Sequence, residues 1–197
     1  MTFNPETDYI LSNERVELRP LLRSDFNLLK NYSIEEPELW KYSLTEASSP
    51  ELLQTYIELA LNERNNKTQY PFIVFDKKTN QYAGSTRFYD IQVNHQCLQL
   101  GFTWYGKEFH GTGLNQNCKY LMLEFAFEKL DMQRVEFRAD FNNKKSIAAM
   151  KKIGCTEEGI LRSNCSTPDG ERRNSIVLSI LKSEWENGVK SDLIKQL

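Results

Sequence analysis

Residues 109–115 read Phe-His-Gly-Thr-Gly-Leu-Asn and lie between an apolar run, LQLGFTWY, and a long pattern typical of a helix. The first turn of a helix carries unpaired backbone N–H groups and the positive end of the helix dipole, and both favour an anion. Gly111 and Gly113 leave room for a phosphate to approach the backbone closely. The turn that opens the expected helix 114–130 is therefore a candidate site for a pyrophosphate group.

The glycine turn differs from two familiar phosphate motifs. No Lys-Ser or Lys-Thr pair follows the glycines, which excludes a P-loop, and the third glycine of the dinucleotide-binding fingerprint is missing. A GTG segment is weak evidence on its own, so a tight turn with a purely structural role stays open as an alternative.

A second polar cluster follows the expected strand 134–140. Asp140 ends that strand, and Asn143 and Ser146 come next within ADFNNKKSIAAMKKIGC. Ligands of such sheets bind outside the carboxyl ends of parallel strands. We therefore expect this cluster and the glycine turn to face one cleft.

The elements that position these residues follow from the spacing of apolar side chains. The amino-terminal half predicts a strand, a helix capped by Ser24, a helix that begins near Ser49, and an antiparallel meander of three strands. The four strands span 15–21, 72–76, 82–91 and 97–105.

The second half predicts a helix over 114–130, a strand over 134–140, a helix over 144–153, and final strands around GILR and SIVLSIL. The strand–helix–strand passage makes strands 97–105 and 134–140 a parallel pair within an otherwise antiparallel sheet. The predicted fold class is α+β, a mixed α/β layer, in a single domain over residues 1–197.

Composition narrows the function classes. With 197 residues and a net charge of −2, the chain gives no reason to expect nucleic acid as a partner. It has neither an apolar window long enough for a membrane span nor the start of a secretory signal. The four cysteines show no CxxC spacing and only two histidines accompany them, so we expect no metal, and reduced cysteines in a cytoplasmic protein.

Taken together, these motifs resemble the GNAT superfamily of acetyl-CoA-dependent N-acetyltransferases, and within it the branch of the ribosomal-protein alanine and serine N-acetyltransferases. The resemblance covers about residues 11–181 and begins with LSNERVELRPLLRSDF. His110, Gly113 and Asn115 occupy the positions of the acetyl-CoA loop of the family. The later Asn143-Lys-Lys-Ser146 and Lys152-Ile-Gly-Cys155 are similar to the family's asparagine-containing helix and its end.

The resemblance implies a sheet of about seven strands with helices on both faces and a V-shaped split between strands 97–105 and 134–140. Acetyl-CoA would lie in that split, with Asn143 and Ser146 near the pantetheine arm and the sulfur. The acceptor would be a small-molecule amine or a protein N-terminus, and homodimers are common in this branch. The implied contacts to pyrophosphate come from the backbone of His110, Gly111, Thr112, Gly113, Leu114 and Asn115, and those to pantetheine from Thr103, Trp104 and Tyr105.

Some residues depart from the family pattern. His110 replaces Gln or Arg, and we expect its ring either to contact a phosphate or to be an ordinary half-exposed histidine. Met150 stands where many members have a tyrosine that acts as general acid, so it is predicted to pack in the core. Ser146 then becomes the catalytic candidate that stabilises the thiolate, with helix capping or a plain cofactor contact as the alternative.

Gln99 occupies the position where some relatives carry an acidic general base, and an amide cannot take a proton. At pH 7 a lysine amine is neutral about four times in ten thousand, whereas an α-amine is neutral about one time in seven. Without a base, a lysine acceptor would face about 3.5 kcal/mol more deprotonation cost. The sequence therefore favours an α-amine or a small amine of low pKa, with a water chain to Glu124 or Asp140 left open.

The resemblance implies an acceptor pocket whose entrance lies near the first two helices. Trp40, Tyr42 and Phe88 could line it, with Arg87 available for an acidic acceptor. Core packing is the alternative for the aromatic residues, and plain surface exposure for the arginine. A second function class also stays open, because Met150 and Gln99 at chemical positions would suit a non-catalytic acyl-CoA-binding or regulatory protein.

Overall fold

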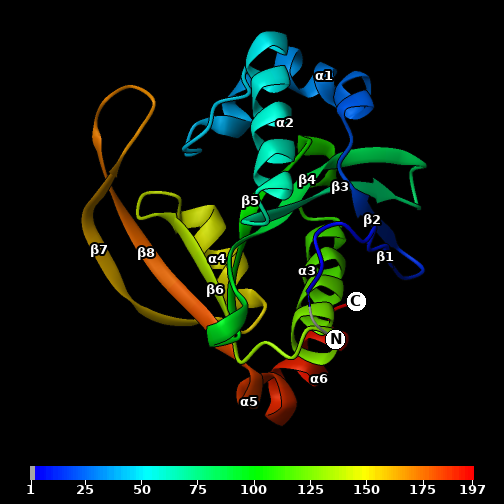
Figure 1. Ribbon diagram of the computed structural model, residues 1–197, viewed down its shortest axis with the longest axis vertical. Coiled ribbons are helices and arrows are strands. Elements are labelled where there is room, and N and C mark those ends of the chain that lie inside the picture. Colours follow the sequence, from blue (N-terminus) through cyan, green and yellow to red (C-terminus); the bar gives the residue numbers. More distant parts are fainter. Residues whose placement is uncertain (1–2) are drawn as a thin grey trace.

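The computed structural model describes residues 3–197, and these residues form one eight-stranded sheet that is antiparallel except between β5 and β6 (Figure 1). The spatial order is β1-β2-β3-β4-β5-β6-β8-β7. The strands are β1 (Leu11–Ser12), β2 (Val16–Pro20), β3 (Gln69–Asp76), β4 (Gln81–Gln92), β5 (Cys97–Tyr105), β6 (Arg134–Asp140), β7 (Thr156–Ser166) and β8 (Arg172–Leu181).

The predicted mixed sheet is confirmed, including the meander β3-β4-β5 and the parallel β5–β6 pair. The eighth strand, the two-residue β1, is the small difference from the expected seven. Alternation explains β2, in which Val16, Leu18 and Pro20 are buried while the residues between them are partly exposed.

Helices cover both faces of the sheet (Figure 1). They are α1 (Phe26–Glu35), α2 (Pro50–Asn65), α3 (Leu114–Glu124), α4 (Lys144–Lys152), α5 (Lys182–Glu184) and α6 (Lys190–Ile194). Short 3-10 turns span Arg23–Asp25, Pro37–Trp40, Val93–His95 and Lys107–Phe109, and π-helical turns span Phe125–Lys129 and Trp185–Val189.

The structure confirms the predicted start of α2, but not the predicted cap of α1. The helix predicted to start near Ser48–Ser49 begins at Pro50, and Ser49 caps it, since its Oγ accepts the amide of Leu52 at 3.2 Å. The prediction that Ser24 caps α1 is wrong. A 3-10 turn precedes α1, and the N-cap of α1 is Asp25, whose side chain makes no cap hydrogen bond to that helix. The carboxylate of Asp25 instead closes the 3-10 turn by accepting the amide of Leu22 at 2.8 Å, and it also accepts from the guanidinium of Arg19 at 2.7 Å.

Two apolar cores lie on opposite faces of the sheet. The larger one packs α3 and Trp185 against the strands, and the smaller one packs α1 and α2 through residues such as Leu53 and Tyr56. Trp104 of β5 belongs to the smaller core, and Phe88 of β4 to the larger. The sheet is thus held rigidly on both sides of the strand that carries the expected cofactor contacts.

A β-bulge distorts β5 where that strand faces the expected cleft. Ser85 pairs with Trp104 and Arg87 pairs with Gly101, so Thr86 alone opposes two residues, Phe102 and Thr103. Phe102 takes up the extra length with a φ of 49°. The bulge turns the backbone of β5 just where it separates from β6.

Candidate functional site

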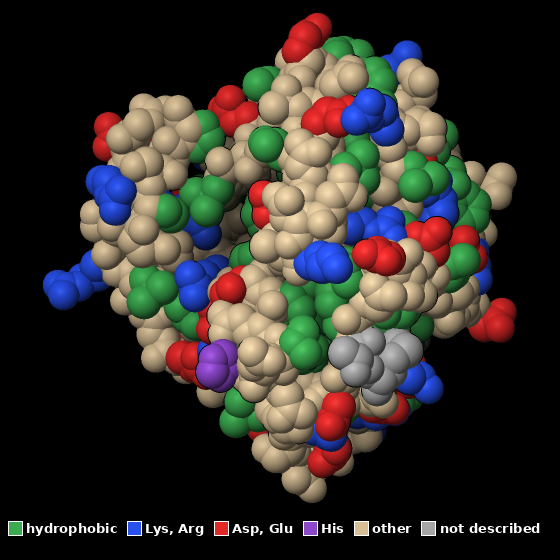
Figure 2. All heavy atoms as spheres, viewed as in Figure 1, with side chains coloured by type: hydrophobic (Ala, Val, Ile, Leu, Met, Phe, Trp, Pro, Cys, Tyr) green, Lys and Arg blue, Asp and Glu red, His purple; other side chains and the backbone are tan. Residues whose placement is uncertain are grey.

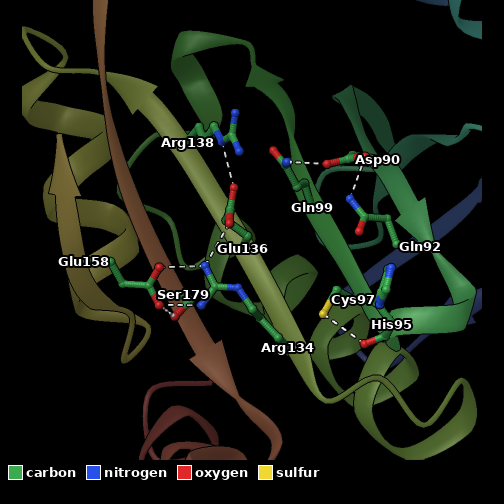
Figure 3. Close-up of polar contacts among 10 residues, drawn as sticks. All are labelled: Asp90, Gln92, His95, Cys97, Gln99, Arg134, Glu136, Arg138, Glu158 and Ser179. Carbon is green, nitrogen blue, oxygen red and sulfur yellow. Dashed lines mark hydrogen bonds and ion pairs between the residues drawn. The ribbon is translucent and has the colours of Figure 1, made fainter. Parts of the chain in front are cut away.

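The parallel strands β5 and β6 pair over only three residues each, Cys97–Gln99 with Arg134–Glu136. Beyond Gln99 and Glu136 the two strands diverge, as Figure 3 shows. The divergence opens a cleft of about 1130 Å³ that is lined from β5, β6, α3, α4 and the β7–β8 hairpin. Figure 2 shows the surface hollowed between that hairpin, at the left of the view, and the body of the molecule beside it.

The glycine turn forms one end of this cleft. Gly111 has a φ of 75°, and Gly113, the residue before α3, has a φ of 88°, so both take left-handed conformations that favour glycine. A Cβ added at either position would meet nothing within 4 Å, so the space above the turn is open. Within residues 3–197 their two amides donate no hydrogen bond. This combination of free donors, helix start and open space fits a bound anion.

Thr112 braces the turn from within. Its Oγ1 donates to the carbonyl of Phe109 at 2.8 Å and accepts the amide of Leu114 at 3.4 Å. Leu114 is buried and anchors the start of α3 in the core, while Asn115 is half-buried and lines the cleft. The turn is therefore preformed rather than loose.

The ring of His110 is occupied on both nitrogens. Nε2 donates to the carbonyl of Tyr105 at 2.9 Å, and Nδ1 lies 2.7 Å from Nζ of Lys145, a geometry that suits a neutral ring accepting from an ammonium group. Burial, and then the charge of Lys145, lower the pKa of His110. The ring thus positions Lys145, which the sequence did not single out, at the cleft beside the glycine turn. A second cation also reaches this turn, since Nη2 of Arg15 lies 3.5 Å from Oγ1 of Thr112.

The backbone of Thr103, Trp104 and Tyr105 borders the cleft. Ser85 and Gly84 pair with Trp104 and Tyr105 on the β4 side, and β6 pairing has already ended. One edge of this segment therefore faces the split without a strand partner.

Two residues of α4 that the sequence assigned to the cofactor line the same cleft. Asn143 is the N-cap of α4, and its Oδ1 accepts the amide of Ser146 at 3.1 Å. The half-buried Ser146 thus has its amide, not its hydroxyl, engaged in the cap. Met150 is 7% exposed, belongs to the larger core and also lines the cleft.

Lys119 is a cleft residue that no feature of the sequence singles out. It lies beside Cys118 of the apolar stripe of α3, where a lysine usually reaches the surface, yet it is only 5% exposed. Its Nζ donates to Oγ1 of Thr103 at 2.7 Å and lies 3.4 Å from Oγ1 of Thr86. Burial lowers the pKa of Lys119 to about 7.

On the acceptor side, Trp40 packs on Trp104 with ring centroids 5.1 Å apart, and both line the cleft together with Tyr42. Arg173 of β8 is buried there and donates to the carbonyl of Tyr42 at 3.3 Å. Its Nε lies 4.0 Å from Oδ2 of Asp140 and 2.9 Å from Oγ of Ser175. This arginine links the hairpin to the segment before α2.

The other two expected acceptor residues lie elsewhere. Arg87 is 3% exposed, its guanidinium packs over the rings of Tyr56 and Phe102, and it donates to Gln69 at 2.8 Å. Phe88 is fully buried in the larger core. Neither lines the cleft, because successive residues of β4 point to opposite faces of the sheet and packing on each face holds one of the two side chains.

The floor of the split carries an amide rather than a carboxylate. Gln99 is buried, its Nε2 donates to Oδ2 of Asp90 at 2.7 Å, and its Oε1 has no hydrogen-bond partner within the described residues (Figure 3). Glu136, opposite Gln99, is held between Arg134 and Arg138 at 2.8 and 2.7 Å.

Of the two acids considered as ends of a water chain, Asp140 lines the cleft and Glu124 does not. The carboxylate of Glu124 accepts from Tyr120 and pairs with Lys190. Over residues 3–197, no helix is long and apolar enough to cross a bilayer, and no group of three or more acidic, His or Cys side chains is gathered to bind a metal ion.

This chain is similar to known acetyltransferases over most of its length. The acetyltransferase (GNAT) domain model matches residues 15–156. YdaF of Bacillus subtilis (strain 168), provisionally named a ribosomal N-acetyltransferase, is 28% identical over 178 residues, or 88% of this chain and 95% of that protein.

Solved structures agree with the family match. A provisionally named acetyltransferase from T. thermophilus is 32% identical with a TM-score of 0.86, over 95% of this chain and 96% of that one. A structure from Vibrio cholerae, provisionally named a ribosomal-protein-serine acetyltransferase, has a TM-score of 0.74 at 21% identity, over 92% and 99% of the two chains. At that identity the likeness shows a shared fold.

Proposed function

This chain belongs to the GNAT acetyltransferase family and is an N-acetyltransferase, and we propose that it transfers acetyl from acetyl-CoA to a primary amine by direct attack in a ternary complex. The amine would be a protein N-terminal α-amine or a small amine. The observation that carries this proposal is the open glycine turn, whose free amides meet the cleft between β5 and β6.

The donor would lie along the cleft from the glycine turn toward the bulge. The free amides of Gly111 and Gly113 would bind the pyrophosphate, with Lys145 adding a positive charge, whereas the amide of His110 already donates to the carbonyl of Lys107 at 3.0 Å. The free edge of Thr103–Tyr105 would hydrogen bond the pantetheine amides, much as a strand would. Asn143 and Ser146, at the start of α4, would contact the arm near the sulfur.

In the proposed reaction, the neutral nitrogen of the acceptor attacks the thioester carbonyl carbon, the C–S bond breaks, and the amine releases one proton to solvent. Backbone N–H groups near Thr103 polarise the carbonyl, and Ser146 is positioned to donate to the sulfur. Holding the two substrates together supplies most of the acceleration.

The floor of the cleft supports this choice of acceptor. Gln99 cannot remove a proton, and the carboxylate of Glu136 is paired with two arginines. An amine that is already partly neutral at pH 7 therefore suits the site better than a lysine side chain. Because YdaF carries a ribosomal name, amino-terminal peptides of ribosomal proteins are the first acceptors to test.

The test is to incubate the protein with acetyl-CoA and three matched acceptor sets while following thiol release and product masses. The sets are peptides with free N-termini, the same peptides blocked at the N-terminus but carrying a lysine, and small primary amines. We expect acetylation of α-amines or small amines, at least about 10²-fold faster than that of lysine. Tight binding of acetyl-CoA without thiol release in any set would instead support a non-catalytic acyl-CoA-binding protein.

A pair of glycine variants connects the activity to the turn. Gly111→Val should weaken acetyl-CoA binding about tenfold, because the side chain would fill the space over the free amides. Gly170→Val is the matched control, since Gly170 has a similar φ of 87° and open surroundings but lies outside the cleft. Equal affinities of Gly111→Val and Gly170→Val for acetyl-CoA would contradict the proposed site.

A further inference from the structure

Lys119 is a cation buried beneath the bulge of β5. Its Nζ donates to Oγ1 of Thr103 at 2.7 Å, and that oxygen lies 2.7 Å from Oγ1 of Thr86. Among residues 3–197, no carboxylate forms a hydrogen bond or an ion pair with this lysine. Its partners are two neutral hydroxyl groups, so the ammonium charge has no counter-charge.

Such an arrangement is costly, because a buried charge is normally paired. The electrostatic influences on Lys119 from neighbouring side chains come from two thiols, Cys118 on its own helix and Cys155 after α4. Burial raises the pKa of these thiols to about 11 and 12, so both are neutral near pH 7. An anion that enters the cleft near Thr103 would supply the missing counter-charge.

The position of the lysine indicates which anion this is. Lys119 lines the cleft together with Ser146 and Met150, and its hydroxyl partner Thr103 sits where β5 leaves β6. On the proposed function, the thioester lies against this part of β5, and Met150 has no proton to give. Two negative charges form there during the reaction, first on the carbonyl oxygen, which backbone N–H groups stabilise, and then on the sulfur of the leaving coenzyme A. Of the two, the thiolate is the charge that must take up a proton.

We propose that the ammonium group of Lys119 stabilises and then protonates the departing coenzyme A thiolate, an inference that rests on the proposed function. When the C–S bond breaks, the sulfur keeps the electron pair and takes a proton from Nζ. The attacking amine loses one proton to solvent as the amide forms, and Nζ regains one from solvent through the cleft. The overall reaction thus converts amine and thioester to amide and thiol without net gain or loss of protons.

The direct test uses free coenzyme A as the probe and the ultraviolet absorbance of its thiolate. An alkyl thiol of pKa about 8.5 is about 3% ionised at pH 7. We expect coenzyme A bound to the wild-type protein to be about 30% ionised at pH 7, a tenfold increase, after subtraction of the protein alone. The two buried thiols do not interfere, since each stays protonated at this pH.

Lys119→Met should return the bound thiol to about 3% ionised, whereas Lys119→Arg should keep the increase because it keeps the charge. Lys151→Met is the matched control, since Lys151 lies on α4, is paired with Glu157 and is outside the cleft lining. In acetyl transfer, Lys119→Met should lower kcat about 10²-fold with little change in the KM of acetyl-CoA.

The outcomes separate the two proposals. Coenzyme A that binds the wild-type protein with an unchanged thiol pKa would overturn the role of Lys119 and leave the proposed function standing. Failure of the wild-type protein to bind coenzyme A would overturn the proposed function and this inference with it. The wild-type titration decides the matter even where Lys119→Met does not fold.

Discussion

At the scale of single residues, His110 shows how a substituted motif position acquires a new task. Where the family pattern has Gln or Arg, this chain has an imidazole whose two nitrogens hold the Tyr105 carbonyl and the Lys145 ammonium. The charge that would face a phosphate thus comes from α4 and not from the loop itself. His110 thus brings a positive charge to the cleft through Lys145, which it holds in place.

This arrangement gives a prediction for Lys145→Met. Removing the exposed ammonium should raise the KM of acetyl-CoA about fivefold, equivalent to about 1 kcal/mol, with kcat nearly unchanged and with a weaker dependence on salt. Lys144→Met is the control, because its ammonium lies over the ring of Phe141 and outside the cleft lining. Steady-state kinetics at two ionic strengths measure both effects, and equal KM values for the two variants would argue against a phosphate contact at Lys145.

At this scale the sequence predicts the backbone donors of the site but not its cations. Gly111 and Gly113 were identifiable because a positive φ at a helix start requires their residue type. Lys119 and Lys145 carry no such signature, since a lysine in a helix is normally solvated and only tertiary packing turns one toward a cleft. Arg87 and Phe88 were expected in the acceptor pocket, and the structure buries both away from it.

At the scale of elements, the strands next to the split were predicted with their observed bounds, Cys97–Tyr105 and Arg134–Asp140. Apolar residues between polar turns mark such strands clearly. The bulge at Thr86 was not predictable, because it depends on the pairing of two strands and not on either strand alone. The same holds for the start of α1, where a 3-10 turn places Asp25 and not Ser24 at the N-cap.

The close approach of β4 to the bulged strand predicts a strong effect for Gly84→Ala. Gly84 has a φ of 154°, and an added Cβ would overlap the carbonyl oxygen of Trp104. We expect a loss of about 3 kcal/mol in the free energy of unfolding, from backbone strain together with overpacking.

Gly170→Ala is the control for Gly84→Ala, since its φ of 87° causes strain without a clash and should cost about 1 kcal/mol. Urea unfolding of both variants makes the comparison. Similar losses in the two would show that contact with the carbonyl of Trp104 is not what requires glycine at position 84.

At the scale of the whole molecule, the sheet connects two halves through only three parallel residue pairs. Apolar cores on opposite faces hold those halves in place, with Trp104 in one core and Phe88 in the other. The cleft is therefore a permanent feature of the packed fold. Burial of the Lys119 ammonium group in the wall of the cleft lowers the stability of the fold.

The burial of Lys119 predicts how the free energy of unfolding depends on pH. Lys119 has a pKa of about 7 in the folded protein and about 10.4 in the unfolded chain. Between these values the unfolded chain binds the additional proton, so the free energy of unfolding rises with pH, by up to about 1.4 kcal/mol per unit from this group. Below about pH 7 Lys119 is protonated in both the folded and the unfolded state, so the stabilisation that appears at higher pH is absent.

The measurement is urea unfolding of the wild-type protein and Lys119→Met at pH 7, 8 and 9. The wild-type protein should gain stability relative to the variant as the pH rises, while Cys118 and Cys155 are common to both and cancel in the difference. Parallel curves for the two proteins would mean that Lys119 keeps its ordinary pKa when folded.

The hydrogen bond from Arg173 to the carbonyl of Tyr42 ties the β7–β8 hairpin to the segment before α2. Both residues line the cleft, so this tie crosses its acceptor side. A peptide end or a small amine would need less room beside it than a lysine on a broad folded surface. Selection by shape would thus act in the same direction as selection by proton affinity.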